Sequence, residues 1–224
     1  MRIAIFSDVH DNVWTLRAAL HWLRSQEHDR AVGALIYCGD LCSPFTARLM
    51  VEACEDRAVP VHLVWGNNDA DTARITALAK DFACLRIHNE LAELMAAGDD
   101  LLTRKQYEAS RGDYWASPAG CQRIAVNHYD NIALPIAASG KYHVVLFGHN
   151  HAYEARRFAH TLALNPGALM GYNPSKQGDN KDVPATFAVY DTQTSEEKPY
   201  RFYEVTARWH SEEEPGEVRV MNLA

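Results

Sequence analysis

The sequence lacks the features that mark membrane, secreted and polyanion-coating proteins. No apolar run approaches the roughly 18 residues that a membrane helix needs, and Asp8 interrupts the apolar start too early for a secretory signal. Basic residues are scarce: 22 Lys and Arg stand against 29 Asp and Glu, a net charge of −7, which argues against an extended nucleic-acid-binding surface. Five cysteines, an odd number with no C-x-x-C pair, indicate free thiols in a reducing compartment. We therefore expect a cytoplasmic protein.

What is present is ordinary for a globular protein. Of 224 residues, 47% are hydrophobic and 23% are charged, so we expect residues 1–224 to form a single domain. The spacing of Cys38 and Cys42 fits a redox pair, but Cys38 lies in an apolar stretch where a thiol behaves as a small core residue. The eleven histidines are the one unusual count.

The first half of the chain alternates between strand-like and helix-like segments. Strands are expected at 2–6, 31–38 and 59–65, and helices at 13–26, from Ser43-Pro44 onward, and at 70–81. In the second helix, Ser43 would be the N-cap and Pro44 the first helical residue. This order predicts a mostly parallel sheet with right-handed crossovers, in which ligands gather at the carboxyl ends of the strands.

The second half is less regular. The pattern predicts helices at 90–97 and 134–139, strands at 122–127 and 142–147, and antiparallel strands at 153–158, 161–165, 186–190 and 200–205. Composition predicts a loop at 171–184 and a tail at 207–224 whose Glu212–Glu214 run is solvated. Residues 89–120 would form an irregular or helical insertion, either a lid or a dimer contact in a homo-oligomer.

Polar side chains follow the strands that should reach the ligand-binding edge. The segments are Ser7-Asp8-Val9-His10, Gly39-Asp40, Gly66-Asn67-Asn68-Asp69, Asn127-His128 and Gly148-His149-Asn150-His151. Taken singly, each has an ordinary explanation as a cap or a turn. In D-x-H and H-x-H, however, alternate side chains of an extended segment face one way, so both can reach a common centre. Convergence of five such segments on one edge indicates a site.

The remaining histidines carry no such pattern. We interpret them as ordinary hydrogen-bonded surface or core residues: His21, His28, His62, His88, His143, His160 and His210.

The residue types at the strand ends select a class of metal. Two carboxylates, one amide oxygen and four imidazoles, without a thiolate, suit Mn²⁺ first, and also Fe, Zn²⁺, Ni²⁺ or Co²⁺. The candidate ligands are Asp8, His10, Asp40, Asn67, His128, His149 and His151. Seven ligands are too many for one tetrahedral ion and suit two divalent ions that share a carboxylate and activate a bridging water. Such a centre keeps a local positive charge and attracts a phosphodiester despite the negative total.

Together these motifs resemble the calcineurin-like metallophosphoesterases. Phe147-Gly148-His149-Asn150-His151 and the turn Asn165-Pro166-Gly167-Ala168 are most similar to the small prokaryotic phosphodiesterase branch. The resemblance implies a four-layer α/β/β/α sandwich in the α/β class. It also implies that Asp8, His10 and His151 hold one metal, that Asn67, His128 and His149 hold the other, and that Asp40 bridges them.

The resemblance further implies an activity on a small phosphoester substrate. Asp40, Asn67 and His128 would be catalytic in the hydrolysis of phosphodiester or phosphoanhydride bonds by metal-activated hydroxide. The alternative is a weak or inactive scaffold of this fold that binds a protein partner, as in a eukaryotic retromer subunit. Scaffolds may lose metal ligands, and the presence of all seven here favours the enzyme.

The chain also departs from the family pattern near the site. Asn68 stands where many relatives have a general-acid histidine, and Asp11 and Tyr129 replace glycines. Because an amide side chain does not form a stable anion by giving up a proton, Asn68 cannot serve as the general acid. We therefore expect a preference for leaving groups that are stable as anions. Asn12, Asn68 and Tyr129 are the candidate substrate contacts, although Asn12 is also placed to cap the first helix.

Within 89–120, cations and aromatic rings are interleaved in a way that would suit a nucleotide. The cations are Arg104, Lys105 and Arg111, and the rings are Tyr107, Tyr114 and Trp115. A surface helix with ordinary packing aromatics is the competing interpretation.

Overall fold

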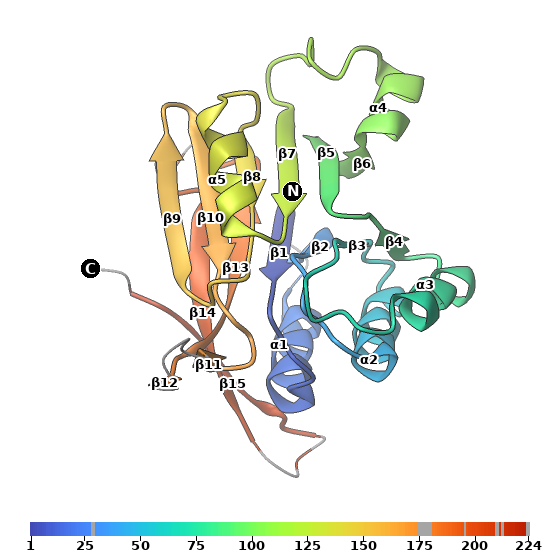
Figure 1. The fold of residues 1–224 in the computed structure, drawn as a ribbon, viewed down its shortest axis with the longest axis vertical. Helices are drawn as coiled ribbons and strands as arrows, with labels where there is room; N and C mark the ends of the chain where they lie inside the picture. The colour runs from blue at the N-terminus through green and yellow to red at the C-terminus, as the bar shows by residue number, and fades with distance from the viewer. Residues whose placement is uncertain (28–29, 174–180, 195, 209–210, 212, 223–224) are drawn as a thin grey trace.

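The computed structural model describes residues 1–27, 30–173, 181–194, 196–208, 211 and 213–222. Two large sheets lie between layers of helices, which confirms the predicted four-layer α/β/β/α class (Figure 1). None of the helices among these residues is long and apolar enough to cross a membrane.

The first sheet has seven strands in the order β15-β14-β13-β1-β2-β3-β4. Its strands are β1 (Arg2–Phe6), β2 (Ala34–Tyr37), β3 (Val61–Leu63), β4 (Leu85–Ile87), β13 (Ala185–Asp191), β14 (Tyr200–Ala207) and β15 (Gly216–Val220). Neighbouring strands from β1 to β4 are parallel, and the crossovers between them are the helices α1 (Val13–Ser25), α2 (Pro44–Glu55) and α3 (Thr72–Asp81). The predicted β-α-β-α-β order is therefore confirmed.

The second sheet has six strands in the order β6-β5-β7-β8-β10-β9. Its strands are β5 (Leu91–Ala97), β6 (Asp100–Thr103), β7 (Gln122–Asn127), β8 (Val144–Leu146), β9 (Tyr153–Phe158) and β10 (Thr161–Pro166). The helices of this half are α4 (Arg104–Arg111) and α5 (Asp130–Ala138). A small ladder joins β11 (Tyr172–Asn173) to β12 (Lys181–Asp182).

Side-chain alternation along the strands builds three apolar layers. In β1, Ala4 and Phe6 face α1, α2 and α3, whereas Ile3 and Ile5 face the second sheet. A third layer packs α4 and α5 on the outer face of the second sheet, where Tyr107 is buried. Because β1, β2 and β3 run parallel, as do β7 and β8, the ends of each set lie along one edge of its sheet.

Local signals placed the start of α2 correctly, whereas α5 begins at Asp130, four residues before the predicted start at 134. The Ser43 side chain accepts a hydrogen bond from the Thr46 N–H, and Pro44 is the first residue of α2, as predicted. This cap fixes where the chain turns after β2 and therefore where residues 39–42 lie.

The predicted helix at 90–97 is wrong, because this segment forms β5. Its Leu, Ala, Glu and Met residues favour a helix intrinsically, but pairing with β6 on one side and β7 on the other overrides that preference. Ala92 and Leu94 face the layer between the sheets, while Met95 faces the outer layer. Gly98, with φ of 67°, makes the tight turn into β6.

Two further segments differ from the sequence interpretation. The expected loop at 171–184 contains β11 and β12, and its residues 174–180 lie outside the described residues. The expected tail at 207–224 contains β15, which pairs with β14; Glu212 of the acidic run lies outside the described residues, as do His28 and His210.

A histidine pair, with His62 buried and His88 half-buried, lies on β3 and just after β4. The Nδ1 atom of His62 is 3.1 Å from Nε2 of His88, and the two rings stack with centroids 5.3 Å apart. Burial, with smaller contributions from His88 and Arg86, lowers the pKa of His62 to about 3, and burial also lowers the pKa of His88. Both rings are therefore neutral at pH 7, as expected for core histidines.

This pair predicts a loss of stability in acid. Because the folded pKa of His62 lies below the unfolded value near 6.5, protonation favours the unfolded chain as pH falls from about 6.5 towards 3. The His62 contribution lost by pH 3.5 is on the order of 4 kcal/mol. Urea unfolding of metal-free protein should show a shallower acid slope for His62→Gln than for wild type, with His21→Gln as an exposed control. Parallel slopes would contradict the assignment.

Candidate metal centre

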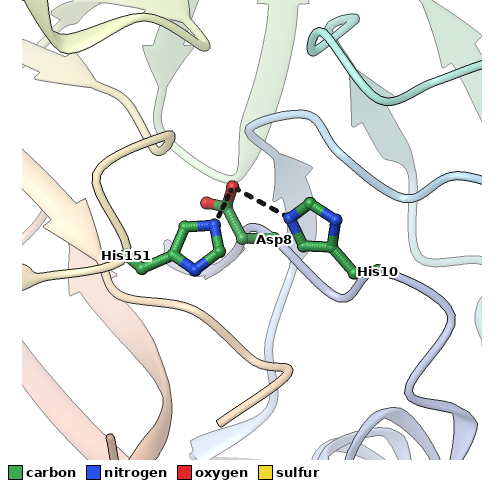
Figure 2. A group of neighbouring side chains, drawn as sticks. All are labelled: Asp8, His10 and His151. Atoms are coloured by element: carbon green, nitrogen blue, oxygen red, sulfur yellow. Dashed lines mark ion pairs between the residues drawn. The ribbon is translucent and has the colours of Figure 1, made fainter. Parts of the chain in front are cut away.

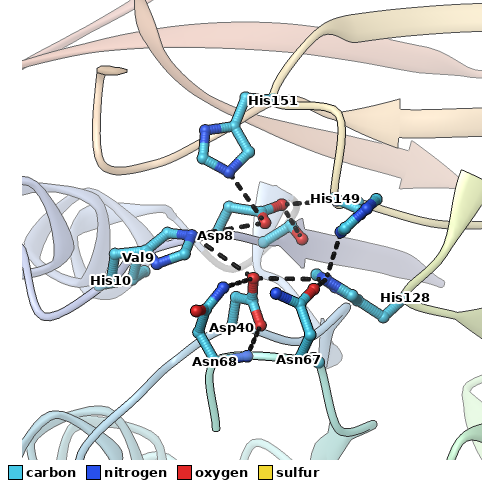
Figure 3. Close-up of polar contacts among 12 residues, drawn as sticks. Asp8, Val9, His10, Asp40, Asn67, Asn68, His128, His149 and His151 are labelled. Atoms are coloured by element: carbon cyan, nitrogen blue, oxygen red, sulfur yellow. Dashed lines mark hydrogen bonds and ion pairs between the residues drawn. The ribbon is translucent and has the colours of Figure 1, made fainter. Parts of the chain in front are cut away.

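The structure brings the polar segments of both sheets to one place (Figure 3). The first sheet contributes Asp8 and His10 after β1, Asp40 after β2 and Asn67 after β3. The second sheet contributes His128 after β7, and His149 and His151 after β8. Their side chains form two adjacent groups, so the predicted convergence is present, while metal binding itself stays a prediction.

The first group consists of Asp8, His10 and His151 (Figure 2). Oδ1 of Asp8 is 3.4 Å from Nε2 of His151 and 3.8 Å from Nε2 of His10. Asp8 Oδ1 and His10 Nε2 are both buried and have no hydrogen-bond partner among the described residues. A buried carboxylate oxygen without a hydrogen bond is costly, and a cation within reach of all three side chains would satisfy it.

The second group consists of Asp40, His128 and His149, with Asn67 beside them. Nε2 of His128 is 3.4 Å from Asp40 Oδ2, 3.1 Å from Asn67 Oδ1 and 3.3 Å from His149 Nδ1. Asp40 Oδ2 is also 3.5 Å from His10 Nε2. Asp40 therefore lies between the two groups, in the position that a bridging carboxylate requires.

Backbone carbonyls orient two of the imidazoles. Nδ1 of His128 lies 2.8 Å from the Cys38 carbonyl, and Nδ1 of His151 lies 2.7 Å from the Tyr172 carbonyl. Since a carbonyl oxygen only accepts, each Nδ1 carries the hydrogen, and in the neutral ring the lone pair is on Nε2. Each Nε2 faces a carboxylate, the arrangement that a metal-binding histidine has. The donor set thus fits divalent transition metals.

The charges of the site also favour a cation. Burial alone would raise the pKa of Asp8, but the neighbouring imidazoles of His10 and His151 hold it below its usual range. Burial likewise opposes ionisation of Asp40, yet His128 and Asn68 lower its pKa. Burial would lower the pKa of His128 and His151, and their contacts with Asp40 and Asp8 raise it instead. These buried, ionised carboxylates therefore attract positive charge to the site.

The backbone at the site is left-handed, contrary to the extended alternation that the sequence pattern predicted. Positive φ values occur at Asp8 (51°), His10 (43°), Asp40 (61°), His149 (72°) and His151 (58°). Each such residue costs of order 1–3 kcal/mol. The surroundings hold this conformation: Asp8 N–H donates to the Gly39 carbonyl and His10 N–H to the Asp40 carbonyl.

Two residues with supporting roles were not predicted as such. The Asp69 carboxylate accepts hydrogen bonds from the N–H groups of Asp40, Leu41, Cys42 and Gly66, and so fixes the turn that carries Asp40. Ser7 Oγ donates to Asp8 Oδ2 at 2.5 Å. A side chain at Gly148 would collide with Ser7 Oγ, so glycine is needed there for the close approach of the two loops. The G-N-x-D and S-D patterns were visible in the sequence, but their partners were not.

The candidate substrate contacts divide in two. Asn12 caps α1 by accepting from the Thr15 N–H, and its amide donates to the Met170 carbonyl. Asn68 donates to both oxygens of Asp40, from its backbone N–H at 2.7 Å and from its amide at 2.8 Å. Tyr129, in contrast, packs its half-buried ring against His128 and His149. Of the three, Tyr129 alone makes no side-chain hydrogen bond among the described residues.

The aromatic residues of 89–120 do not lie over this centre. Tyr107 and Tyr114 are buried in the outer layer of the second sheet, and Arg104 pairs with Glu93 and Glu108. The segment leads into the amino end of β7, whereas His128 follows its carboxyl end; in Figure 1, α4 lies at the top, beside β6. The buried rings of Tyr107 and Tyr114 therefore fit the competing interpretation of packing aromatics.

Cys42 contacts the His10 ring, and its contribution to metal binding can be tested. Its Sγ lies 3.6 Å from Nδ1 of His10, and no carbonyl partner is present at this nitrogen among the described residues. Loss of such a partner typically weakens metal binding by about 10- to 100-fold. We expect Cys42→Ala to weaken Mn²⁺ binding in calorimetry, Cys42→Ser to retain it, and Cys121→Ser to serve as a control outside the site. An unchanged affinity in Cys42→Ala would show that His10 needs no such partner.

Fold and site together define a phosphoesterase domain. Residues 1–195 match the calcineurin-like phosphoesterase superfamily domain, and the chain belongs to that superfamily. The resemblance read from the motifs is thereby confirmed.

Three individual proteins are similar to the chain in sequence or in fold. The chain is similar to phosphodiesterase MJ0936 from Methanocaldococcus jannaschii, with 26% identity over 201 residues that cover 90% of this chain and 97% of that protein. Its fold is similar to that of an archaeal phosphodiesterase of known structure, with a TM-score of 0.64, 24% identity, and coverage of 90% of this chain and 98% of that one. It is also similar to Zn²⁺-complexed Vps29 from Entamoeba histolytica, with a TM-score of 0.55, 15% identity, and coverage of 99% and 98%.

Proposed function

We propose that this protein is a metal-dependent phosphoesterase that hydrolyses phosphodiester or phosphoanhydride bonds at a centre of two divalent ions. Asp8, His10 and His151 would hold one ion, and Asn67, His128 and His149 the other, with Asp40 between them. The supporting observation is the position of Asp40 Oδ2, within 3.5 Å of Nε2 in one histidine of each group. When bound, the ions supply an activated hydroxide and offset the charge of the phosphate.

Three sets of groups from the protein prepare the site. Asp40, fixed by Asn68 and by the turn that Asp69 holds, keeps the two groups together. The carbonyls of Cys38 and Tyr172 fix the rings of His128 and His151, so that little reorganisation is needed on loading. Tyr129 lies beside the second group and is placed to contact the organic part of the substrate. We propose that it is the substrate contact among the three predicted.

The contacts of Asn68 indicate which leaving groups the site would prefer. The Asn68 amide donates a hydrogen bond to Asp40. Because an amide does not give up a proton near neutral pH, Asn68 does not protonate the leaving group. We infer a preference for leaving groups that are stable as anions, such as aryl or phosphoryl groups.

The test is hydrolysis of bis(p-nitrophenyl) phosphate and of p-nitrophenyl phosphate by protein stripped with EDTA and reloaded with one metal at a time. We expect release of nitrophenol with Mn²⁺, faster for the diester, and none without metal. Absence of release above the buffer rate with Mn²⁺, Fe²⁺, Zn²⁺, Ni²⁺ and Co²⁺ would reject the proposal. The likeness of the fold to Vps29 would then favour a scaffold that binds a protein partner.

A cytoplasmic location remains part of this proposal. All five cysteines are free thiols, and Cys38, Cys54 and Cys84 are buried. Free buried thiols are typical of proteins from reducing compartments.

A further inference from the structure

A cavity lies far along the first sheet from the candidate metal centre. It has a volume of about 520 Å³, within the range of small-molecule pockets. Arg2, at the amino end of β1, is one of its walls, whereas Asp8 follows the carboxyl end of the same strand. The two sites are therefore separated by the full length of β1.

The register of the strands explains why the cavity exists. Arg2 is on the same face of β1 as Ala4, which packs against the helices, and it pairs with Asp191 of β13. In the neighbouring strand pairs, Val189 of β13 is opposite Arg201 of β14, and Tyr203 of β14 is opposite Val220 of β15. These side chains therefore lie on the same face of the sheet as Arg2. The carboxyl end of α1, with Trp22 and the C-cap residue Gln26, forms one wall.

The floor of the cavity is aromatic and apolar. The Trp22 ring lies 4.5 Å from the Tyr203 ring, and Tyr203 in turn stacks on Phe187 at 5.0 Å. Tyr203 is buried, while Trp22 is partly buried at the cavity wall. Packed rings of this kind offer a rigid surface on which a planar group can stack.

The rim is basic in a protein whose net charge is −7. Four cations line the cavity against two carboxylates: Arg2, Arg30, Lys198 and Arg201 against Asp191 and Glu196. The carboxylates compensate only part of this charge, and Glu196 pairs loosely, at 3.9 Å from Arg201 with both side chains more than 60% exposed. A local excess of two positive charges beside an aromatic floor selects an anion that carries a planar ring.

We propose that this cavity binds a nucleotide, with the phosphate at Arg30 and Arg201 and the base against Trp22. The site is separate from the phosphoesterase centre and shares no residue with it, so it can hold a nucleotide while the centre is occupied. The chemistry that it recognises is a phosphate monoester joined to a planar heterocycle.

The experiment measures binding of AMP by calorimetry to the full chain carrying Asp40→Asn, in EDTA, so that the metal centre cannot hold the nucleotide. AMP should bind, and the double change Arg30→Gln/Arg201→Gln should weaken it by at least about 10-fold, the usual effect of losing charge-assisted hydrogen bonds. Arg219→Gln is the matched control, because Arg219 lies between Val218 and Val220 on the opposite face of β15 and should leave the affinity within twofold.

Two further probes separate a nucleotide site from a phosphate site. Trp22→Leu should weaken AMP by several-fold and leave the weaker binding of inorganic phosphate unchanged. The proposal is overturned if AMP fails to bind, if the double change has no effect, or if phosphate binds as tightly as AMP and Trp22→Leu changes neither. None of these outcomes depends on phosphoesterase activity, so the proposed function is tested separately.

Discussion

Replacing Asp40 by Asn is expected to lower the metal-dependent hydrolysis of an aryl phosphodiester on the order of 10³-fold or more. The carboxylate lies between the two groups, with Oδ2 3.5 Å from His10 Nε2 and 3.4 Å from His128 Nε2. An amide has the same shape but lacks the negative charge that two neighbouring cations need between them. The measurement is kcat/KM with saturating Mn²⁺, together with the number of metal ions bound per chain.

Controls distinguish this loss from general damage. Asp56→Asn changes an exposed carboxylate at the end of α2 and should leave kcat/KM unchanged. His128→Ala should reduce the rate to a similar degree as Asp40→Asn, because it removes a buried member of the second group. Full activity in Asp40→Asn, with an intact circular dichroism spectrum, would show that Asp40 does not bridge.

Loading the centre with Mn²⁺ is expected to stabilise the fold strongly. At a free ion concentration 100 times Kd, one site adds about 2.7 kcal/mol to the free energy of unfolding and two independent sites about 5 kcal/mol. For a chain of this length, 5 kcal/mol corresponds to a rise in Tm of roughly 10–20 °C. The physical reason is that loading satisfies Asp8 Oδ1 and His10 Nε2, which are buried without hydrogen-bond partners among the described residues.

The gain in Tm on adding Mn²⁺ also tests the two groups of candidate ligands separately. His151→Ala removes a ligand of the first group alone and should keep about half of the gain in Tm. His160→Ala, at an exposed histidine that contacts the Gly140 carbonyl, should keep all of it. An unchanged Tm of the wild type on adding Mn²⁺, measured by differential scanning calorimetry, would contradict metal binding at this centre.

The location of the centre was predictable because strand ends are predictable. Apolar runs such as 2–6 and 142–147 end at polar residues, and parallel strands carry those ends to one edge whatever the details of the turns. The local conformation was not predictable. Left-handed backbone at Asp8 and His10 is stabilised by hydrogen bonds to Gly39 and Asp40, about 30 residues away in sequence.

Side-chain partners from distant segments explain the other differences. Nothing near Asn12 in the sequence indicates that its amide donates to Met170, and nothing near Leu91–Ala97 indicates that β7 pairs with it. At Asn12 a tertiary contact decided between the two roles that the sequence allowed, and at 91–97 strand pairing overrode the predicted helix. Sequence patterns list such alternatives but do not choose between them.

The pairing of β1 with β13 has a consequence for biosynthesis. Arg2 lies opposite Asp191, so one edge of β1 stays open until β13 has been made. His149 and His151 likewise emerge long after Asp8 and His10, so neither candidate metal-binding group is complete before residue 149 has been synthesised. Open strand edges promote wrong pairings, and distant pairings form slowly. A nascent chain stopped before β13 is therefore expected to engage chaperones, and release from them should coincide with synthesis of residues 185–191.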